Sequence, residues 1–166
     1  MKNFYTLLVA LSFLLFQSCT IEDNTEYIDN DTISEAFEIT TSFNTANGFS
    51  KLVSLNPAIF NSDVVLVYRL SGVTTQGNDI WKLLPEMYFY NDGTLDFGYK
   101  FDFTKNDVRI FMFGNELETV VSDYKTNQVF RIVIVPAYFS NTIDIANIDN
   151  VLSALKINKA EIQLLK

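Results

Sequence analysis

Hydrophobic and polar residues alternate through much of the chain after residue 35, which is the pattern that half-buried β-strands produce. In the first such segment Phe37, Ile39, Thr41 and Phe43 alternate with more polar neighbours. Later segments of strand length are Phe49–Leu55, Val64–Ser71, Met87–Tyr90, Leu95–Phe103, Val108–Phe113 and Gln128–Val135, with turn residues between them. Short strands without regular helices between them predict an all-β domain, an antiparallel β-sandwich of the immunoglobulin-like kind.

Asp92-Gly93 predicts the two-residue turn of a β-hairpin, because both residue types tolerate positive φ angles. In that register Tyr90 lies opposite Leu95, and Tyr88 lies opposite Phe97. One face of the hairpin then carries Tyr88, Tyr90, Leu95, Phe97, Tyr99, Phe101 and Phe103, and the other carries Asp96, Lys100 and Asp102. We expect the first face in the core and the second in solvent.

Helical spacing replaces the alternation near the C-terminus. Ile148, Val151, Leu152 and Leu155 share one face of a helix, with Asn147 as its N-cap. One short helix is therefore expected, followed by an edge strand over Ala160–Leu165. The β-sandwich domain is expected to span residues 35–166.

The first residues have a different pattern. Lys2 precedes an apolar run from Phe4 to Phe16, and residues 1–18 together have the form of a secretory signal peptide. The run is too short for a comfortable membrane span, which needs roughly 20 residues. We expect the signal to be removed.

Cys19 is the only cysteine in the chain. Phe16-Gln17-Ser18-Cys19 resembles the lipobox of bacterial lipoproteins, in which the cysteine receives diacylglycerol and becomes the first residue of the mature protein. The match departs from the usual box at Phe16 and Gln17. The resemblance implies a lipid on Cys19 that holds the protein on a membrane. The alternative is a free thiol in an ordinary signal peptide.

Residues 19–34 join the lipidated cysteine to the domain. Thr20–Ser34 contains five acidic residues and no basic one, which predicts a flexible tether of roughly 20 to 25 Å. Glu22 and Asp23 resemble the signal that exports some Bacteroidota lipoproteins to the cell surface. Asp31-Thr32-Ile33 resembles an O-glycosylation motif of those bacteria, with Thr32 as the acceptor. A plain polar spacer is the alternative to both.

Composition excludes several kinds of function. The formal net charge is -8, which opposes nucleic-acid binding because phosphate contacts need clustered Lys and Arg. The chain contains no histidine, so Ser-His-Asp triads and histidine metal sites are absent. With Cys19 acylated, no thiol nucleophile or zinc cluster remains. We therefore expect no catalytic residues, no metal and no cofactor.

Two groups of residues are candidates for ligand binding, each with a structural alternative. Trp81 follows the loop Thr74–Asp79 and could stack on a sugar, or it could plug the end of the sandwich. Arg69 and Arg131 interrupt apolar strands. They could form a binding pair for an acidic ligand, or they could face solvent or form structural ion pairs.

Four aspartates near turns, Asp92, Asp96, Asp102 and Asp107, could bind calcium through their oxygens. None belongs to a spaced calcium-binding loop. Aspartate is also an ordinary turn residue, which is the simpler explanation.

Three segments carry a resemblance to a known family. They are Ser62–Leu70 (SDVVLVYRL), Asp79–Pro85 (DIWKLLP) and Asn127–Ala137 (NQVFRIVIVPA). They resemble a family of short Bacteroidota lipoproteins of unknown role, from about Ala36 to the C-terminus. Some members carry a collagen-like Gly-Pro-Pro segment after the lipobox, which this chain lacks. The resemblance implies no activity and no catalytic residues.

The sequence thus predicts a non-enzymatic binding or accessory module, anchored by lipid to the outer membrane and facing the cell surface. Its expected partners are the membrane, through Cys19, and a protein or glycan ligand. The alternative is an assembly subunit of an outer-membrane complex, in which Phe37–Phe43 or Ala160–Leu165 pairs with a strand of a partner.

Overall fold

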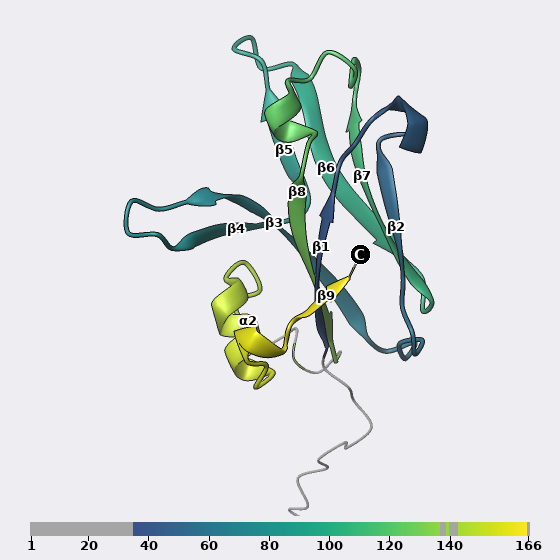
Figure 1. Ribbon diagram of the computed structural model, residues 1–166, viewed down its shortest axis with the longest axis vertical. Coiled ribbons are helices and arrows are strands. Elements are labelled where there is room, and N and C mark those ends of the chain that lie inside the picture. Colours follow the sequence, from purple (N-terminus) through teal and green to yellow (C-terminus); the bar gives the residue numbers. More distant parts are fainter. Residues whose placement is uncertain (1–34, 137–138, 140–142, 166) are drawn as a thin grey trace, which may run out of the picture. The chain divides into compact units, whose positions relative to one another are not determined.

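The computed structural model describes residues 35–136, 139 and 143–165. Two β-sheets pack face to face in this part of the chain, and one short α-helix covers the outer side of one sheet (Figure 1). The predicted all-β sandwich with a short C-terminal helix is confirmed. The expected signal peptide, the lipid site at Cys19 and the tether with Thr32 lie outside the described residues.

Sheet A has the strand order β4 (Asp79–Leu83), β3 (Val64–Val73), β8 (Gln128–Val135), β1 (Ala36–Thr41) and β9 (Gln163–Leu165). Sheet B has the order β2 (Ser50–Ser54), β7 (Asp107–Gly114), β6 (Leu95–Phe103) and β5 (Glu86–Phe89). Neighbouring strands are antiparallel except β1 and β9, which are parallel.

The predicted strands all form, and one observed strand has no counterpart among them. β4 is a short edge strand that contains Asp79, Trp81 and Lys82. Its burial is incomplete along its length, so it lacks the apolar alternation that reveals the other strands. The expected strand at Ala160–Leu165 is shorter than predicted, because the short 3₁₀ helix η5 (Lys159–Glu161) precedes β9.

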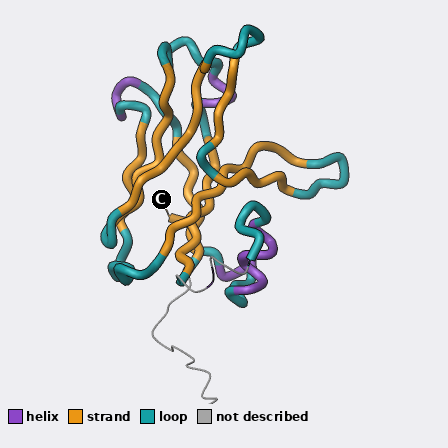
Figure 2. The backbone as a smooth tube through the Cα atoms, turned by 180° about the vertical axis from the view of Figure 1, so that it is seen from behind, coloured by secondary structure: helices purple, strands orange, loops and turns teal. Residues whose placement is uncertain are grey.

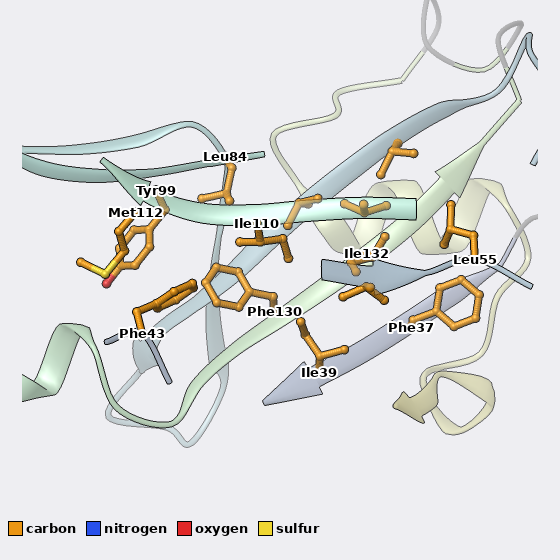
Figure 3. Close-up of a cluster of buried hydrophobic side chains, with 14 of the residues drawn as sticks. Phe37, Ile39, Phe43, Leu55, Leu84, Tyr99, Ile110, Met112, Phe130 and Ile132 are labelled. Atoms are coloured by element: carbon orange, nitrogen blue, oxygen red, sulfur yellow. The ribbon is translucent and has the colours of Figure 1, made fainter. Parts of the chain in front are cut away.

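The main hydrophobic core lies between the two sheets (Figure 3). Phe37, Ile39, Phe130 and Ile132 from sheet A meet residues of sheet B such as Ile110 there. Alternate residues of β3 and β8 point the other way, and Tyr68 and Val133 pack against the C-terminal helix in a second core. Because sheet A is buried on both faces, the sequences of its central strands are nearly continuous runs of apolar residues.

The C-terminal helix α2 (Ile148–Ala154) begins where its N-cap was predicted. The side chain of Asn147 accepts hydrogen bonds from the backbone N–H groups of Asp149 and Asn150. Ile148, Val151 and Leu152 are buried against sheet A. The Tyr68 hydroxyl donates to the carbonyl of Ile145, 2.7 Å away, which ties the segment before the helix to β3.

The hairpin between β5 and β6 differs from its prediction. Tyr88 lies opposite Phe97 as expected, but a bulge then places Phe89, rather than Tyr90, opposite Leu95. The N–H of Gly93 donates to the carbonyl of Tyr90, and the N–H of Tyr90 donates to the carbonyl of Thr94. The turn therefore has three central residues, and only Gly93 needs a positive φ, which is 85°.

The burial of the aromatic residues in this hairpin also differs from the prediction. Phe97 and Tyr99 belong to the core, whereas Tyr90 is 51% exposed and Phe103 is 42% exposed. The prediction that both residues lie in the core is wrong. Strand β6 is longer than the core that covers it, so only its middle part is buried.

The hairpin of β3 and β4 projects away from the rest of the two sheets (Figure 2). A register shift between Leu70 and Gly72 marks the point where the strand pair becomes irregular. Val73 and Ile80, near the tip, are exposed to solvent.

The strand register defines two ends of the sandwich. At the entry end, where Glu35 leads into β1, lie loop 55–63 and turn 104–106. At the far end lie segment 42–49, turn 90–94 and segment 115–127. Both ends can be followed in Figure 1 from the labelled strands.

Candidate functional site

Trp81, the predicted binding residue, lies on β4 and on the outer face of sheet A. The guanidinium carbon of Arg131 lies 4.0 Å from the centroid of its ring. Arg131 also forms an ion pair with Glu38, with 2.8 Å between Nε and Oε2. The indole is half-buried and packs against the cluster that holds α2. The indole therefore packs against the protein, but on the outer face of sheet A and not at the end of the sandwich as the alternative proposed. A ligand on the remaining surface of the ring stays a prediction.

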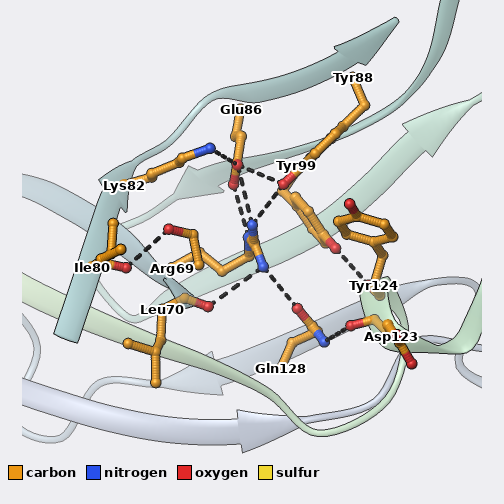
Figure 4. Close-up of polar contacts among 11 residues, drawn as sticks. Arg69, Leu70, Ile80, Lys82, Glu86, Tyr88, Tyr99, Asp123, Tyr124 and Gln128 are labelled. Carbon is orange, nitrogen blue, oxygen red and sulfur yellow. Dashed lines mark hydrogen bonds and ion pairs between the residues drawn. The ribbon is translucent and has the colours of Figure 1, made fainter. Parts of the chain in front are cut away.

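Arg69 and Arg131 point to opposite faces of sheet A, so they do not form one binding pair. Arg69 points inward and is buried together with Glu86 of β5 (Figure 4). Its Nε lies 2.8 Å from Oε2 of Glu86, and its Nη2 lies 3.1 Å from Oε1 of the same carboxylate. The structural ion-pair alternative is therefore correct for both arginines.

The remaining donors of Arg69 are also satisfied. Its Nη2 donates to the Tyr88 hydroxyl at 2.7 Å, and its Nη1 donates to Oε1 of Gln128 at 3.0 Å. Glu86 Oε1 accepts further bonds from the Tyr88 hydroxyl and from Nζ of Lys82. Figure 4 shows that these side chains come from both sheets. The polar groups of this cluster thus bond to one another, and their bonds connect sheet A to sheet B.

Burial and hydrogen bonding act in opposite directions on these groups. Burial alone raises the pKa of Glu86, but hydrogen bonds from Arg69, Tyr88 and Lys82 outweigh it and lower that pKa below its ordinary value. Burial lowers the pKa of Arg69, and the bonds to Glu86 raise it above its ordinary value. Burial, together with the bond to Glu86, raises the pKa of the Tyr88 hydroxyl well above its usual range. All three groups keep their usual charge at neutral pH.

The outer face of sheet B carries a second aromatic group. Phe111 and Phe113 lie on β7, and the ammonium of Lys100 sits 5.2 Å and 4.7 Å from their ring centroids. Phe113 lies over Gly98, where an added Cβ would approach the ring within 2.7 Å. The contact with Lys100 explains why these two rings are half-exposed, and no ligand is needed to explain their position.

Two hollows lie side by side at the far end of the sandwich. The first, of about 420 Å³, is lined by Phe43, Asn44, Thr45, Phe49, Glu118, Lys125 and Thr126. The second, of about 600 Å³, is lined by Phe49, Gly114, Asn115, Glu116, Leu117, Glu118 and Thr119. Phe49 and Glu118 line both hollows, so the two hollows adjoin at these residues. We call this pair of hollows the Phe49 site.

The backbone holds Phe49 in an unusual conformation. Its φ is 52°, in the left-handed region that bulky residues rarely adopt. Its N–H donates to the carbonyl of Asn44 and its carbonyl accepts from the N–H of Met112, both at 2.9 Å. Asn44 and Asn47 close a reciprocal capping box around the short 3₁₀ helix η2 (Thr45–Asn47) just before it. Strained residues of this kind cluster at ligand sites.

Lys125 shapes the other wall of the Phe49 site. Its ammonium donates to the carbonyl of Glu118 at 2.7 Å, which leaves the carboxylate of Glu118 exposed. No hydrogen bond joins that carboxylate, or the hydroxyl of Thr45, to another described residue. The site therefore combines a half-buried ring with polar residues that can bond a ligand, and polar residues make up most of its lining.

Sequence reasoning missed this site for a physical reason. Phe49 looked like the first residue of a strand, and Asn47-Gly48 looked like an ordinary turn. Nothing in the local sequence pattern indicates that the backbone of Phe49 adopts a left-handed conformation. Glu118 and Lys125 join it only because β2 pairs with β7, and β1 pairs with β8.

The turn aspartates serve local structure. Asp92 accepts hydrogen bonds from the backbone and hydroxyl of Thr94, and Asp102 pairs with Arg109 across β6 and β7. Within the described ranges, no group of three or more His, Cys, Asp or Glu residues is placed to hold a metal ion.

One alternative from the sequence needs correction. Phe37–Phe43 was a candidate for pairing with a partner strand, but β1 lies between β8 and β9 inside sheet A. β8 pairs with β1 along Ala36–Thr41, and β9 occupies its other edge along Phe37–Ile39. β9 does lie at an edge of sheet A, as expected for Ala160–Leu165.

No helix in the described part of the chain has the length and hydropathy that crossing a bilayer requires. A scan against protein-family models matches no family, and no curated protein or solved structure matches the chain either.

Proposed function

We propose that this protein is a non-enzymatic binding module of the bacterial cell envelope, held on the outer membrane by a lipid on Cys19 and facing the cell surface. Its lipobox and the three family segments support a place among the short Bacteroidota lipoproteins that it resembles. The ligand of the module is a glycan, bound at the Phe49 site.

The observation that carries the proposal is the geometry around Phe49. Phe49 is half-buried and lines two adjoining hollows, whose other lining residues include asparagine, threonine and glutamate. A pyranose packs its apolar face on such a ring and bonds its hydroxyls to such groups. Loops at one end of a sandwich are also where binding residues commonly lie.

Binding is tested by titrating the protein with maltohexaose, xylohexaose, mannohexaose and chitohexaose in a calorimeter. Phe49→Ala should abolish the heat of binding of any sugar that the native protein binds. Phe89→Ala is the matched control, because Phe89 is an exposed ring that lines neither hollow. Circular dichroism shows whether each variant is folded. Equal binding by native protein and Phe49→Ala, or no binding of any sugar, contradicts the proposed site.

Anchoring is tested by membrane fractionation and proteinase treatment of intact cells. Native protein should stay with the outer membrane and be digested, whereas Cys19→Ala should be released. Native protein that is membrane-bound but protected would contradict the outward orientation and leave the anchor intact.

A second function, assembly through strand pairing, is favoured by the hairpin of β3 and β4. β4 is an edge of sheet A, and the tip of the hairpin exposes Val73 and Ile80. A photocrosslinking amino acid at Ile80 should capture a protein at fixed stoichiometry if this function holds. The same group at Leu52, exposed on edge strand β2, is the control.

A further inference from the structure

The entry end of the sandwich exposes two phenylalanine rings. Phe60, in the loop between β2 and β3, is 48% exposed, and Phe103, at the end of β6, is 42% exposed. Backbone hydrogen bonds join the two segments: the N–H of Ile59 donates to the carbonyl of Lys105, and that of Leu55 donates to the carbonyl of Asn106. Both rings therefore lie on segments at the same end of the sandwich, and we call them the entry-end aromatic pair.

Neither ring belongs to the hydrophobic core. The neighbouring residues Ile59 and Phe101 pack against the core as half-buried side chains. Phe103 stacks on Phe101, with 6.5 Å between ring centroids, and 42% of it remains exposed. Exposed Phe rings at a turn leave apolar area in solvent, and burying such area is favourable by roughly 25 cal/mol per Å². The pair is thus suited to an apolar partner.

The chain itself indicates what lies against this end. Glu35 is the first described residue, and its carbonyl accepts a hydrogen bond from the N–H of Ile134 beside the start of β1. The segment from Cys19 to Glu35 joins the domain at the entry end, and as a coil it spans roughly 20 to 25 Å. A nine-residue strand such as β6 is about 30 Å long. We therefore expect a lipid on Cys19 to keep the membrane closer to the entry end than to the far end.

One exposed cation lies beside the pair. Lys105 is exposed in the turn between β6 and β7, two residues after Phe103, and the acidic residues Asp63 and Asp107 lie at the same end of the sandwich. Aromatic rings flanked by lysine are typical of groups that sit at the level of lipid headgroups, where the ammonium meets phosphate. The overall charge of -8 disfavours strongly anionic bilayers, so a largely zwitterionic surface suits the domain better.

We propose that the entry-end aromatic pair rests on the lipid surface to which the protein is anchored, with Phe60 and Phe103 inserted at headgroup level. This inference rests on the proposed lipid anchor at Cys19. It adds a second, weaker contact that orients the domain, so that the Phe49 site at the far end points away from the membrane.

The experiment uses the full lipidated protein, reconstituted in phosphatidylcholine vesicles whose acyl chains carry bromine, a quencher of tryptophan fluorescence. Trp81 is the only tryptophan, so Trp81→Phe provides a silent background. Phe60→Trp and Phe103→Trp report on the entry end. Phe89→Trp is the matched control, because Phe89 lies at the far end and is at least as exposed as the two entry-end rings. Flotation of the vesicles shows separately whether the protein is anchored.

Each entry-end tryptophan should lose about half of its fluorescence in brominated vesicles, because interfacial groups lie roughly 5 to 10 Å into the headgroup and acyl boundary. The Phe89→Trp control should lose none. Protein that floats with the vesicles but shows no quenching at either position overturns the inference and leaves the anchor intact. Protein that fails to float overturns the anchor, and the inference falls with it.

Discussion

Replacing Glu86 by Gln should strongly destabilise the fold. Both oxygens of Glu86 accept hydrogen bonds from donors, namely Arg69, Lys82 and Tyr88. An amide nitrogen in place of either oxygen faces a donor, and the buried guanidinium loses its counter-charge. Breaking a buried ion pair from one side costs about 3 to 5 kcal/mol. Since domains are stable by about 5 to 15 kcal/mol in total, this is a large fraction.

The free energy of unfolding is measured by urea denaturation, followed by circular dichroism and by the fluorescence of Trp81. A loss of this size lowers Tm by about 12 to 20 °C, at about 4 °C per kcal/mol for a domain of this length. The double variant Arg69→Met, Glu86→Leu should recover most of the loss, because it removes both charges together. Lys82→Met is the control and should cost under about 1 kcal/mol, since that side chain is 52% exposed.

The pH dependence follows from the direction of the pKa shift. Glu86 has a lowered pKa in the folded protein, so it stabilises the fold above its unfolded pKa of about 4.3. That contribution is lost as the pH falls through the lower, folded value. Glu86→Gln should therefore lose less stability than native protein on acidification. A loss below about 1 kcal/mol in Glu86→Gln at neutral pH, or no recovery in the double variant, would refute the reasoning.

Three further changes probe packing and capping. Gly98→Ala should cost about 2 kcal/mol or more, because its Cβ would lie 2.5 Å from the carbonyl of Glu86; an unchanged Tm contradicts this. Asn147→Ala should cost about 1 kcal/mol through loss of the N-cap of α2, measured by urea denaturation. Arg131→Met should cost about 1 to 2 kcal/mol and shift the emission of Trp81, because the indole loses its cation and Glu38 its partner. An unaltered emission spectrum speaks against that stacking.

Much of the fold could be predicted from local pattern. The side chains of Phe37 and Ile39 alternate with polar residues because a strand has a period of two. The segment from Val64 predicted a strand, and β3 forms there with its two faces in the two hydrophobic cores. Asn147 marked the start of α2 because a short polar side chain can bond the free N–H groups of a first turn.

Other features depended on contacts between distant segments. Arg69 and Arg131 look alike in sequence, yet one is buried beside Glu86 and the other stacks on Trp81, because their positions in β3 and β8 send them to opposite faces. The bulge before Phe89 moved Tyr90 out of the core, since a three-residue turn satisfies its backbone hydrogen bonds at the cost of the simple register.

The class of fold was determined by the sequence, because alternation is a local property, whereas the lipid on Cys19 stays a prediction. The Phe49 site and the entry-end aromatic pair were decided by tertiary structure alone. Each gathers residues from loops that are far apart in the chain. Sheet pairing brings those loops together, and local sequence carries no record of that pairing.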